Sequence, residues 1–411
     1  MQFAIIGAGA AGCFAAANLS AEAGRCATIW EKSGKALQKV RASGGGRCNV
    51  THELFDVPEL TNRYPRGPRW LKKTLHRFSP EHTVEWFAKK GVELVAEGDG
   101  RMFPITNSAE TIASCLWEEL HRKKVAVKFN QRLEGLQKTD GQWQMDFGSA
   151  GIQTADAVLL TTGGSPSPAG YDLLRKLGHA IEMPVPSLFT FNIPKHPICE
   201  LMGVSVPQAK VRICGTKIEM EGPLLVTHWG LSGPAVLRAS AWGARELATR
   251  AYDFQILVNW IPDFDEEALQ EQLKNSARNE GGAALWGKNP FGLPRRLWQF
   301  LLGDIGIKEI TTWGNLPAGH RKALVERLLR DPFTIKGKTT FKEEFVTCGG
   351  VALSEVNPQT MESRLHPGLY FAGEVLDVDG ITGGFNFQHA WASGFIAAQS
   401  LNERIKEEVV V

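Results

Sequence analysis

Apolar runs at both ends of the chain stop at glycines. This pattern is typical of buried strands that are followed directly by tight turns. FAIIG (residues 3–7) predicts a first strand, the alanine-rich stretch behind it predicts a helix, and CATIWEK (26–32) predicts a second strand. AVLLTTGG (157–164) and GLYFAGE (368–374) have the same character and predict two further strands. The chain therefore opens with a βαβ unit and ends in a related segment.

The pattern changes after a proline-rich passage at residues 182–197. Short β-prone stretches fill residues 201–226, residues 232–248 predict a helix with Pro234 in its first turn, and residues 251–260 predict a strand. Helical spacing at 264–279, 294–305 and 317–331 predicts a helical cap, and residues 333–350 return to β-structure. A separate, inserted region therefore lies between the two glycine-rich ends.

Composition narrows the classes of partner. The 411 residues carry a formal net charge of only +2, so no global basic field predicts a nucleic-acid partner, and small molecules are expected instead. No apolar run reaches the roughly 18 residues of a membrane span, and none is expected. Seven cysteines without a C-x-x-C pattern predict neither a disulfide framework nor a metal site. A cytoplasmic protein fits these features best.

The first glycine cluster follows the first strand at once and matches G-x-G-x-x-G. Gly7 allows a tight turn, Gly9 lets the backbone approach a pyrophosphate, and Gly12 lets helix and strand pack closely. The helix start faces the phosphates with its partial positive charge. The predicted cofactor contacts of this cluster are Gly7, Gly9, Ala10, Ala11 and Gly12. The alternative is a tightly packed βαβ unit without a ligand.

The second strand ends in Glu31 and Lys32. Glu31 lies nineteen residues after Gly12, close to the spacing of about 20 expected for the acid that binds an adenosine ribose. A carboxylate there would repel a 2′-phosphate, so the site suits FAD or NAD rather than NADP.

The sequence SGGGRCN favours FAD over NAD. A second glycine-rich loop just beyond the ribose acid is placed to return along the dinucleotide toward its flavin end, and a fold that binds only NAD needs no such loop. The backbone N–H groups of the three glycines can approach phosphate or ring oxygens without obstruction from side chains, and the arginine of the loop can offset negative charge. The alternative is a flexible hinge with a solvated arginine, and for the cysteine we favour a packing role over a redox role. The predicted contacts here are Ser43, Gly44, Gly45, Gly46, Arg47, Cys48 and Asn49.

Two later segments complete the predicted site. The third strand ends in Thr162, Gly163 and Gly164, where the chain can pass beside a bound cofactor. After the fourth strand, Glu374 can hydrogen-bond ribityl hydroxyls, and a helix start can stabilise negative charge on the pyrimidine side of a reduced flavin. The predicted contacts of this last segment are Gly373, Glu374, Gly383, Gly384, Phe385 and Asn386.

Taken together, GAGAAG, SGGGRCNVTH, PLLVTHWGLSGPAVL and the segment from TCGGVAL to GITGGFN resemble the BaiN/RdsA family of bacterial NAD(P)/FAD-dependent oxidoreductases. The resemblance covers nearly the whole chain. It implies FAD contacts at Gly7, Gly9, Gly12, Glu31, Lys32, Ser43, Gly45, Arg47, Asn49, Thr162, Gly163, Glu374, Gly384 and Asn386. The stretch GGSPSPAGYDLL is shorter here than the glycine- and serine-rich loop of many relatives, so access to the flavin face can differ.

The resemblance also implies the fold class and the division of the chain. It implies an α/β, Rossmann-like (glutathione-reductase-like) FAD-binding domain interrupted by a β-barrel-like insert with a helical cap. We expect the FAD-binding domain at 1–190 and 346–411. The insert is expected at 191–345, with the barrel-like part at 191–262 and 331–345 and the cap at 263–330.

The expected function is an FAD-dependent oxidoreductase that acts on a small organic substrate, with hydride transfer through flavin N5. Because no second G-x-G-x-x-G occurs, NAD(P)H would bind only transiently in the substrate cleft, or the substrate itself would be the reductant. His228 and His389 receive no catalytic assignment, and the substrate and oligomeric state stay open.

Two alternatives remain. One is a flavin-dependent RNA-modifying enzyme, for which the basic clusters Lys72, Lys73, His76 and Arg77, and Arg295 and Arg296, are the residues to test. The other is a non-catalytic FAD-binding sensor.

Overall fold

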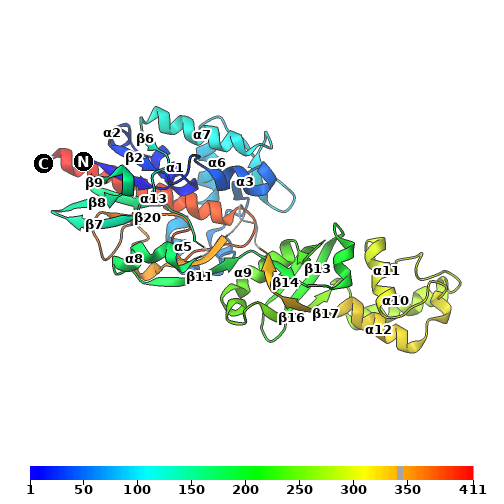
Figure 1. Cartoon of the computed structure of the whole chain (residues 1–411). Coiled ribbons are helices and arrows are strands. Elements are labelled where there is room, and N and C mark those ends of the chain that lie inside the picture. The colour runs from blue at the N-terminus through cyan, green and yellow to red at the C-terminus, as the bar shows by residue number, and fades with distance from the viewer. Residues whose placement is uncertain (166, 340–345, 411) are drawn as a thin grey trace. The chain divides into compact units, whose positions relative to one another are not determined.

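The computed structural model describes residues 1–165, 167–339 and 346–410 (Figure 1). It divides into two compact units. The first contains Met1–Ser187 and the segment Phe341–Val411, and the second contains Leu188–Thr340. The two ends of the sequence therefore build one unit, and the middle of the sequence builds the other.

A five-stranded sheet forms the centre of the first unit, with the strand order β20-β10-β1-β2-β6 and parallel pairing throughout. Four of these strands are those that the apolar runs predict. Because all the strands are parallel, their carboxyl ends, which carry the glycine-rich turns, lie at one edge. The strands are β1 (Phe3–Ile6), β2 (Ala27–Trp30), β6 (Ala126–Lys128), β10 (Ala157–Leu160) and β20 (Leu369–Phe371).

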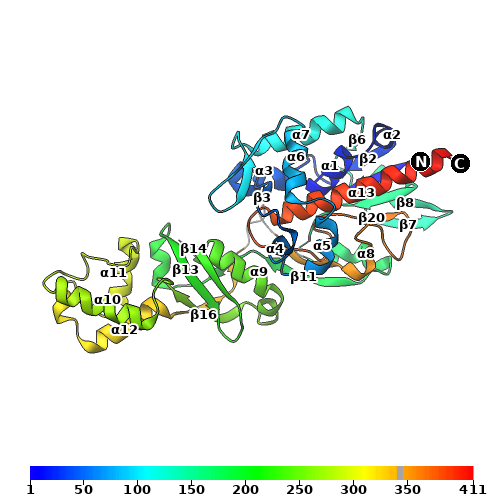
Figure 2. The same ribbon diagram turned by 180° about the vertical axis from the view of Figure 1, so that it is seen from behind.

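Helices α1 (Ala10–Ala17) and α13 (Phe385–Val410) pack against each other beside this sheet (Figure 2). Gly394 makes the close approach possible, because a Cβ atom built on it would lie 2.7 Å from the carbonyl oxygen of Ala11. The first and last helices of the unit thus meet backbone to backbone, although hundreds of residues separate them.

Smaller elements surround this core within the described ranges. The further helices of the first unit are α2 (Ala21–Arg25), α3 (Gln38–Gly46), α4 (Val57–Thr61), α5 (Pro68–Leu75), α6 (Pro80–Ala88), α7 (Ala109–Arg122) and α8 (Asp172–Lys176). The further strands are β3 (Thr51–His52), β4 (Leu94–Ala96), β5 (Arg101–Pro104), β7 (Gly135–Thr139), β8 (Gln142–Asp146), β9 (Ile152–Ala155), β11 (Ile181–Ser187) and β19 (Val346–Val351). Strands β11 and β19 pair antiparallel.

The second unit contains an antiparallel sheet of seven strands in the order β17-β16-β13-β14-β15-β12-β18. The strands at the two ends of this order are joined through Gly337, so the sheet curls until its edges meet. The strands are β12 (Thr190–Asn192), β13 (Ser205–Ile213), β14 (Glu219–Thr227), β15 (Gly230–Ser232), β16 (Asp253–Asn259), β17 (Asp331–Lys336) and β18 (Lys338–Thr339).

Four helices accompany the sheet of the second unit in the described part of the chain. They are α9 (Pro234–Thr249), α10 (Glu266–Asn279), α11 (Arg295–Asp304) and α12 (Ala318–Leu329), and each falls where helical spacing predicts one. Buried tryptophans Trp260, Trp298 and Trp313 fill the core that the sheet and helices share. Residues 340–345, which the sequence assigns to β-structure and to the barrel-like part, lie outside the described residues.

None of the described helices combines the length and the apolar character that crossing a membrane requires. All seven cysteines are free thiols.

The crossing of α1 and α13 predicts the effect of a single methyl group. Gly394→Ala should lower the free energy of unfolding by about 1–3 kcal/mol, because the new Cβ displaces the backbone of α1. Gly319→Ala is the matched control, because Gly319 lies exposed in α12 and, among the described residues, no atom lies within 4 Å of the new Cβ. That variant should be about as stable as the parent protein or slightly more stable. Denaturant unfolding of both variants tests the prediction, and equal stabilities would contradict it.

Candidate nucleotide-binding site

The first glycine turn is closed by contacts between backbone atoms. Gly7 has a φ of +114°, which a side chain disfavours, and a Cβ on it would lie 2.5 Å from the carbonyl oxygen of Thr161. A Cβ on Gly12 would lie 2.1 Å from the carbonyl oxygen of Gly7. The Thr161 hydroxyl donates to the carbonyls of Ile6 (3.0 Å) and Gly7 (2.9 Å). The end of β10 therefore locks the turn between β1 and α1.

Gly9 differs from these two glycines, because its Cβ would point into open space. Among the described residues no heavy atom lies within 4 Å of that position. Gly9 is the N-cap of α1, which Ala10 and Ala11 continue, and no side chain caps this helix start in the described part of the chain. The first N–H groups of α1 are thus available to an anion beside Gly9.

Glu31 lies at the end of β2 and is buried. Its Oε2 accepts a hydrogen bond of 2.8 Å from the N–H of Ala8, inside the glycine turn, and its Oε1 accepts from the N–H and hydroxyl of Ser33. The carboxylate therefore binds the glycine turn directly. Its Oε2, which accepts a single bond here, keeps a lone pair that a ribose hydroxyl can use. Lys32, the next residue, is exposed.

The sequence SGGGRCN forms the end of α3, where the helix breaks. Ser43 has extended backbone angles, and Gly44 and Gly45 have φ values of +60° and +68°. Cβ atoms on Gly45 and Gly46 would find no heavy atom of the described residues within 4 Å, whereas one on Gly44 would meet the ring of Phe103 at 3.0 Å. The loop thus presents bare backbone at two successive positions.

Cys48 packs in the interior, as predicted from its sequence context. Its side chain is fully buried, and burial raises the pKa of the thiol to about 12. A thiol with so high a pKa is protonated at neutral pH and is a poor nucleophile.

Arg47 has protein partners. Its guanidinium lies 4.0 Å from the centre of the Phe103 ring and donates to Glu97 at 2.6 Å. Glu97 therefore offsets part of the positive charge that the arginine would offer to a phosphate.

Asn49 joins this loop to the C-terminal glycines. Its side-chain amide donates to the carbonyl of Thr51 at 3.1 Å and accepts from the N–H of Gly384 at 3.0 Å. A Cβ on Gly384 would lie 2.5 Å from the Thr51 carbonyl oxygen, so only glycine fits there. Gly383 lies beside the ring of Phe385, which stacks on His52.

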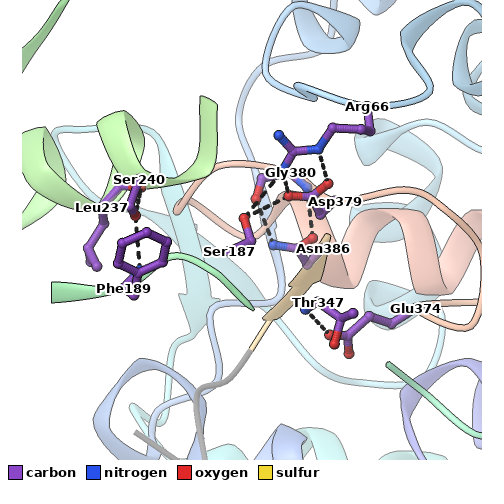
Figure 3. Close-up of polar contacts among 10 residues, drawn as sticks. All are labelled: Arg66, Ser187, Phe189, Leu237, Ser240, Thr347, Glu374, Asp379, Gly380 and Asn386. Carbon is purple, nitrogen blue, oxygen red and sulfur yellow. Dashed lines mark hydrogen bonds and ion pairs between the residues drawn. The ribbon is translucent and has the colours of Figure 1, made fainter. Parts of the chain in front are cut away.

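Gly373 and Glu374 follow β20. The N–H of Gly373 donates to Ser393 (2.9 Å), and its carbonyl accepts from His389 (3.2 Å), so α13 holds this turn. Glu374 accepts from the N–H of Thr347 at 2.8 Å (Figure 3). It also accepts from the ammonium group of Lys39 at 2.6 Å. A contact between Glu374 and the ribityl chain of a flavin stays a prediction. The partners just given for its carboxylate are protein groups.

The third predicted segment lies beside this carboxylate. A Cβ on Gly164 would lie 2.8 Å from the Glu374 Oε1 and 2.4 Å from the Thr347 hydroxyl, so the two segments touch. Gly163 has a φ of +74°, and no described heavy atom lies within 4 Å of its Cβ position. Thr162 is exposed.

Asn386 fixes the loop in front of α13. Its side-chain oxygen accepts from the N–H of Gly380 (2.8 Å), and its nitrogen donates to the Gly380 carbonyl (3.0 Å) (Figure 3). The Tyr64 hydroxyl donates to the carbonyl of Phe385 at 2.7 Å.

Three residues outside the predicted contacts help to build the site: Thr161, Lys39 and Thr347. Thr161 directly precedes the predicted Thr162, and its position at the end of a strand is the signal that identifies it. For Lys39 and Thr347 the sequence offers no local signal, because their partner Glu374 is distant in the chain.

His228 lies in the second unit, exposed in the turn between β14 and β15, with its ring centre 3.7 Å from that of Trp229. Both residues line a cavity of about 490 Å³, together with Lys195, His196 and Lys336. A cavity of this size accommodates a small organic molecule.

The segments of the first unit fit a dinucleotide. Gly9, Gly45, Gly46 and Gly163 leave backbone open from three different segments, and Glu31 supplies hydroxyl acceptors. None of the described side chains forms a group of three or more His, Cys, Asp or Glu that could hold a metal ion.

A parallel sheet, a glycine turn that leads into an uncapped helix start, and a carboxylate at the end of the second strand are typical of nucleotide-binding α/β proteins. Residues 1–400 match the HI0933-like protein Rossmann domain, and the chain belongs to this family. The predicted family and fold class are thereby confirmed.

Curated relatives of similar length match almost end to end. The 3-dehydro-bile acid delta(4,6)-reductase of Clostridium scindens is 30% identical and aligns over 98% of this chain and 99% of its own. The ribosomal RNA dihydrouridine synthase of Escherichia coli is 31% identical over 97% of each chain.

Among solved structures, 3-ketosteroid-delta4-(5alpha)-dehydrogenase from Rhodococcus jostii RHA1 has the same fold. The TM-score is 0.50 at 13% identity, over 97% of this chain and 96% of that one.

The contrast between two glycines predicts separable effects. Gly9→Val should leave the stability of the FAD-free protein within about 1 kcal/mol, because its side chain enters open space, and should abolish FAD binding. Gly12→Val should instead destabilise the protein, because its Cβ overlaps the Gly7 carbonyl. Thermal unfolding without FAD and titration with FAD measure the two effects. Tight FAD binding by Gly9→Val would refute the assignment of the first turn.

His389 predicts a pH dependence of stability. Complete burial lowers its pKa from 6.5 to about 4, so at pH 5 the unfolded chain binds a proton that the folded chain does not. Stability is therefore full above pH 6.5 and falls as the pH decreases toward about 4, by roughly 3 kcal/mol in total from this group.

The comparison variant is His389→Gln, whose amide can still donate to the Gly373 carbonyl. Denaturant unfolding between pH 7 and pH 4.5 should show a smaller loss of stability for this variant than for the parent protein. Equal losses would show that another group causes the acid sensitivity.

Proposed function

We propose that this chain is an FAD-dependent oxidoreductase that reduces an activated carbon–carbon double bond in an organic substrate. The observation that carries the proposal is that Gly9, Gly45 and Gly163 leave their backbone open in the same unit that contains Glu31, the proposed ribose acid. Reduced FAD bound there would supply a hydride from its N5 atom to one carbon of the double bond, and water would supply the proton that the other carbon takes up.

The relatives support the type of reaction. One relative is named as a reductase of a bile acid's delta(4,6) double bonds, and the others are named for forming dihydrouridine, in which the carbon–carbon double bond of uridine is saturated. The substrates differ, and the bond that is reduced is of the same kind. The proposal for this chain therefore specifies the bond and leaves the rest of the substrate to its own residues.

The residues of the chain act by binding and orienting the cofactor. The helix start at Gly9 and Ala10 would stabilise the pyrophosphate, and Glu31 would orient the adenosine ribose. The start of α13 at Phe385 would place a partial positive charge near the pyrimidine side, where reduction adds negative charge. These groups favour the reduced state without a proton-transferring side chain.

NAD(P)H is proposed as the electron donor. Because the sequence holds no second G-x-G-x-x-G, the nicotinamide would bind transiently in the substrate cleft and leave before the substrate enters.

A second candidate function is the reduction of a uridine in RNA. Two relatives, from Escherichia coli and Haemophilus influenzae, are named ribosomal RNA dihydrouridine synthases, at 31% and 29% identity. Lys72 and Lys73 on α5 and His76 directly after it are exposed and offer a basic surface to phosphates.

The test is an anaerobic visible spectrum of the purified protein before and after addition of NADH or NADPH. We expect a flavin spectrum that bleaches with one of the two nucleotides and recovers when an enone or an unmodified RNA is added. Recovery with RNA alone would select the second candidate. A spectrum that persists with both nucleotides would point to an amine or other organic donor, or to a sensor, and failure to bind FAD after reconstitution would refute the proposal.

A further inference from the structure

The loop between β20 and α13 contains a fully buried acid, Asp379, that the flavin motifs do not include. Its carboxylate accepts two hydrogen bonds from the guanidinium of Arg66, whose side chain is only 10% exposed (Figure 3). The hydroxyl of Ser187 donates to the same carboxylate at 2.7 Å. A buried charge that is matched in this way holds its partners in one geometry.

Asp379 directly precedes Gly380, whose N–H and carbonyl both bind Asn386 at the start of α13. The loop that contains Arg63 and Tyr64 holds this segment in place. The carbonyl of Arg63 accepts from the N–H of Ile381 at 3.0 Å, and the Tyr64 hydroxyl donates to the carbonyl of Phe385. The segment that we assign to the pyrimidine side of the flavin is thus fastened to the loop that carries Arg66.

Ser187 occupies a particular place in the chain. It ends β11 and is the last residue of the N-terminal segment of the first unit, and Leu188 after it has a φ of +47°. On β19, the strand paired with β11, Val346 lies opposite Ser187. Asp379 therefore binds the chain at the point where it leaves the first unit.

We propose that Asp379 is a positioning residue that ties the flavin-binding segment Gly383–Asn386 to the end of β11. The pair with Arg66 holds the loop in the shape that flavin needs, and the bond to Ser187 fixes the exit of the chain to that loop. A shift of the chain at Ser187 would therefore also shift the segment Gly383–Asn386. This inference rests on the proposed function, because it takes the flavin to lie at that segment.

The charges predict different consequences for two substitutions. Asp379→Asn removes the negative charge that faces the guanidinium of Arg66, so FAD affinity should fall about tenfold as the loop loosens. The flavin reduction potential should rise, because the loss of a negative charge favours the reduced, anionic flavin. Ser187→Ala removes only the connection and should leave the potential unchanged.

The experiment combines FAD titration, the reduction potential and hydrogen exchange of the amides of residues 377–386, measured with and without FAD. Both variants should exchange faster in this segment than the parent protein. The matched control is Ser240→Ala, because Ser240 is also buried and binds backbone, accepting from Phe189 and donating to Leu237 in the second unit (Figure 3). This control should leave exchange, affinity and potential as in the parent protein.

Two results would overturn the inference. One is Asp379→Asn with the FAD affinity and potential of the parent protein. The other is faster exchange throughout the first unit together with a lower melting temperature, which would make the pair merely structural. Should Asp379→Asn fail to fold, local exchange in Ser187→Ala decides the question. A parent protein that binds no FAD would defeat the proposed function and this inference together, whereas failure confined to the variants would defeat the inference alone.

Discussion

The contact between the first and last glycines of the opening turn sets the geometry of the first unit. Because Gly12 lies against the carbonyl of Gly7, α1 begins directly above the end of β1, and its first N–H groups point past Gly9. Any side chain at Gly12 would push the helix away from the strand. Thr161 then bonds to the carbonyl of Gly7 and fixes the neighbouring strand to the same turn.

The rest of the site is assembled by hydrogen bonds from side chains to backbone. Glu31 binds the N–H of Ala8, Asn49 binds that of Gly384, and Ser393 binds that of Gly373. Each bond satisfies a backbone group that strand or helix pairing leaves open, and in the interior an unsatisfied group would cost about 1–3 kcal/mol. The polar residues around the glycines therefore stabilise loops whose glycines have no side chains to pack.

Local patterns in the sequence predict much of this arrangement and not all of it. The strands, the turn at Gly7–Gly12 and the helices of the second unit follow from apolar spacing and glycine position, which depend on nearby residues alone. The partners of Arg47 and Glu374 do not, because Glu97 and Thr347 approach only after the chain has folded. The sequence indicated that the charges of Arg47 and Glu374 face the cofactor. In the structure Arg47 donates to the carboxylate of Glu97, and Glu374 accepts from the N–H of Thr347.

The residues proposed to hold the cofactor belong to one part of the chain. The glycine turns, Glu31 and the loop with Asp379 all lie in the first unit, and as proposed they would contact FAD, which is the same molecule whatever the substrate. Selection between a steroid-like acid and a nucleotide must therefore depend on other residues, since the cofactor contacts cannot distinguish them. In the second unit, the cavity beside His228 and Trp229 is lined by two lysines, which can bind an anionic group, and by an indole, which can pack on a flat ring.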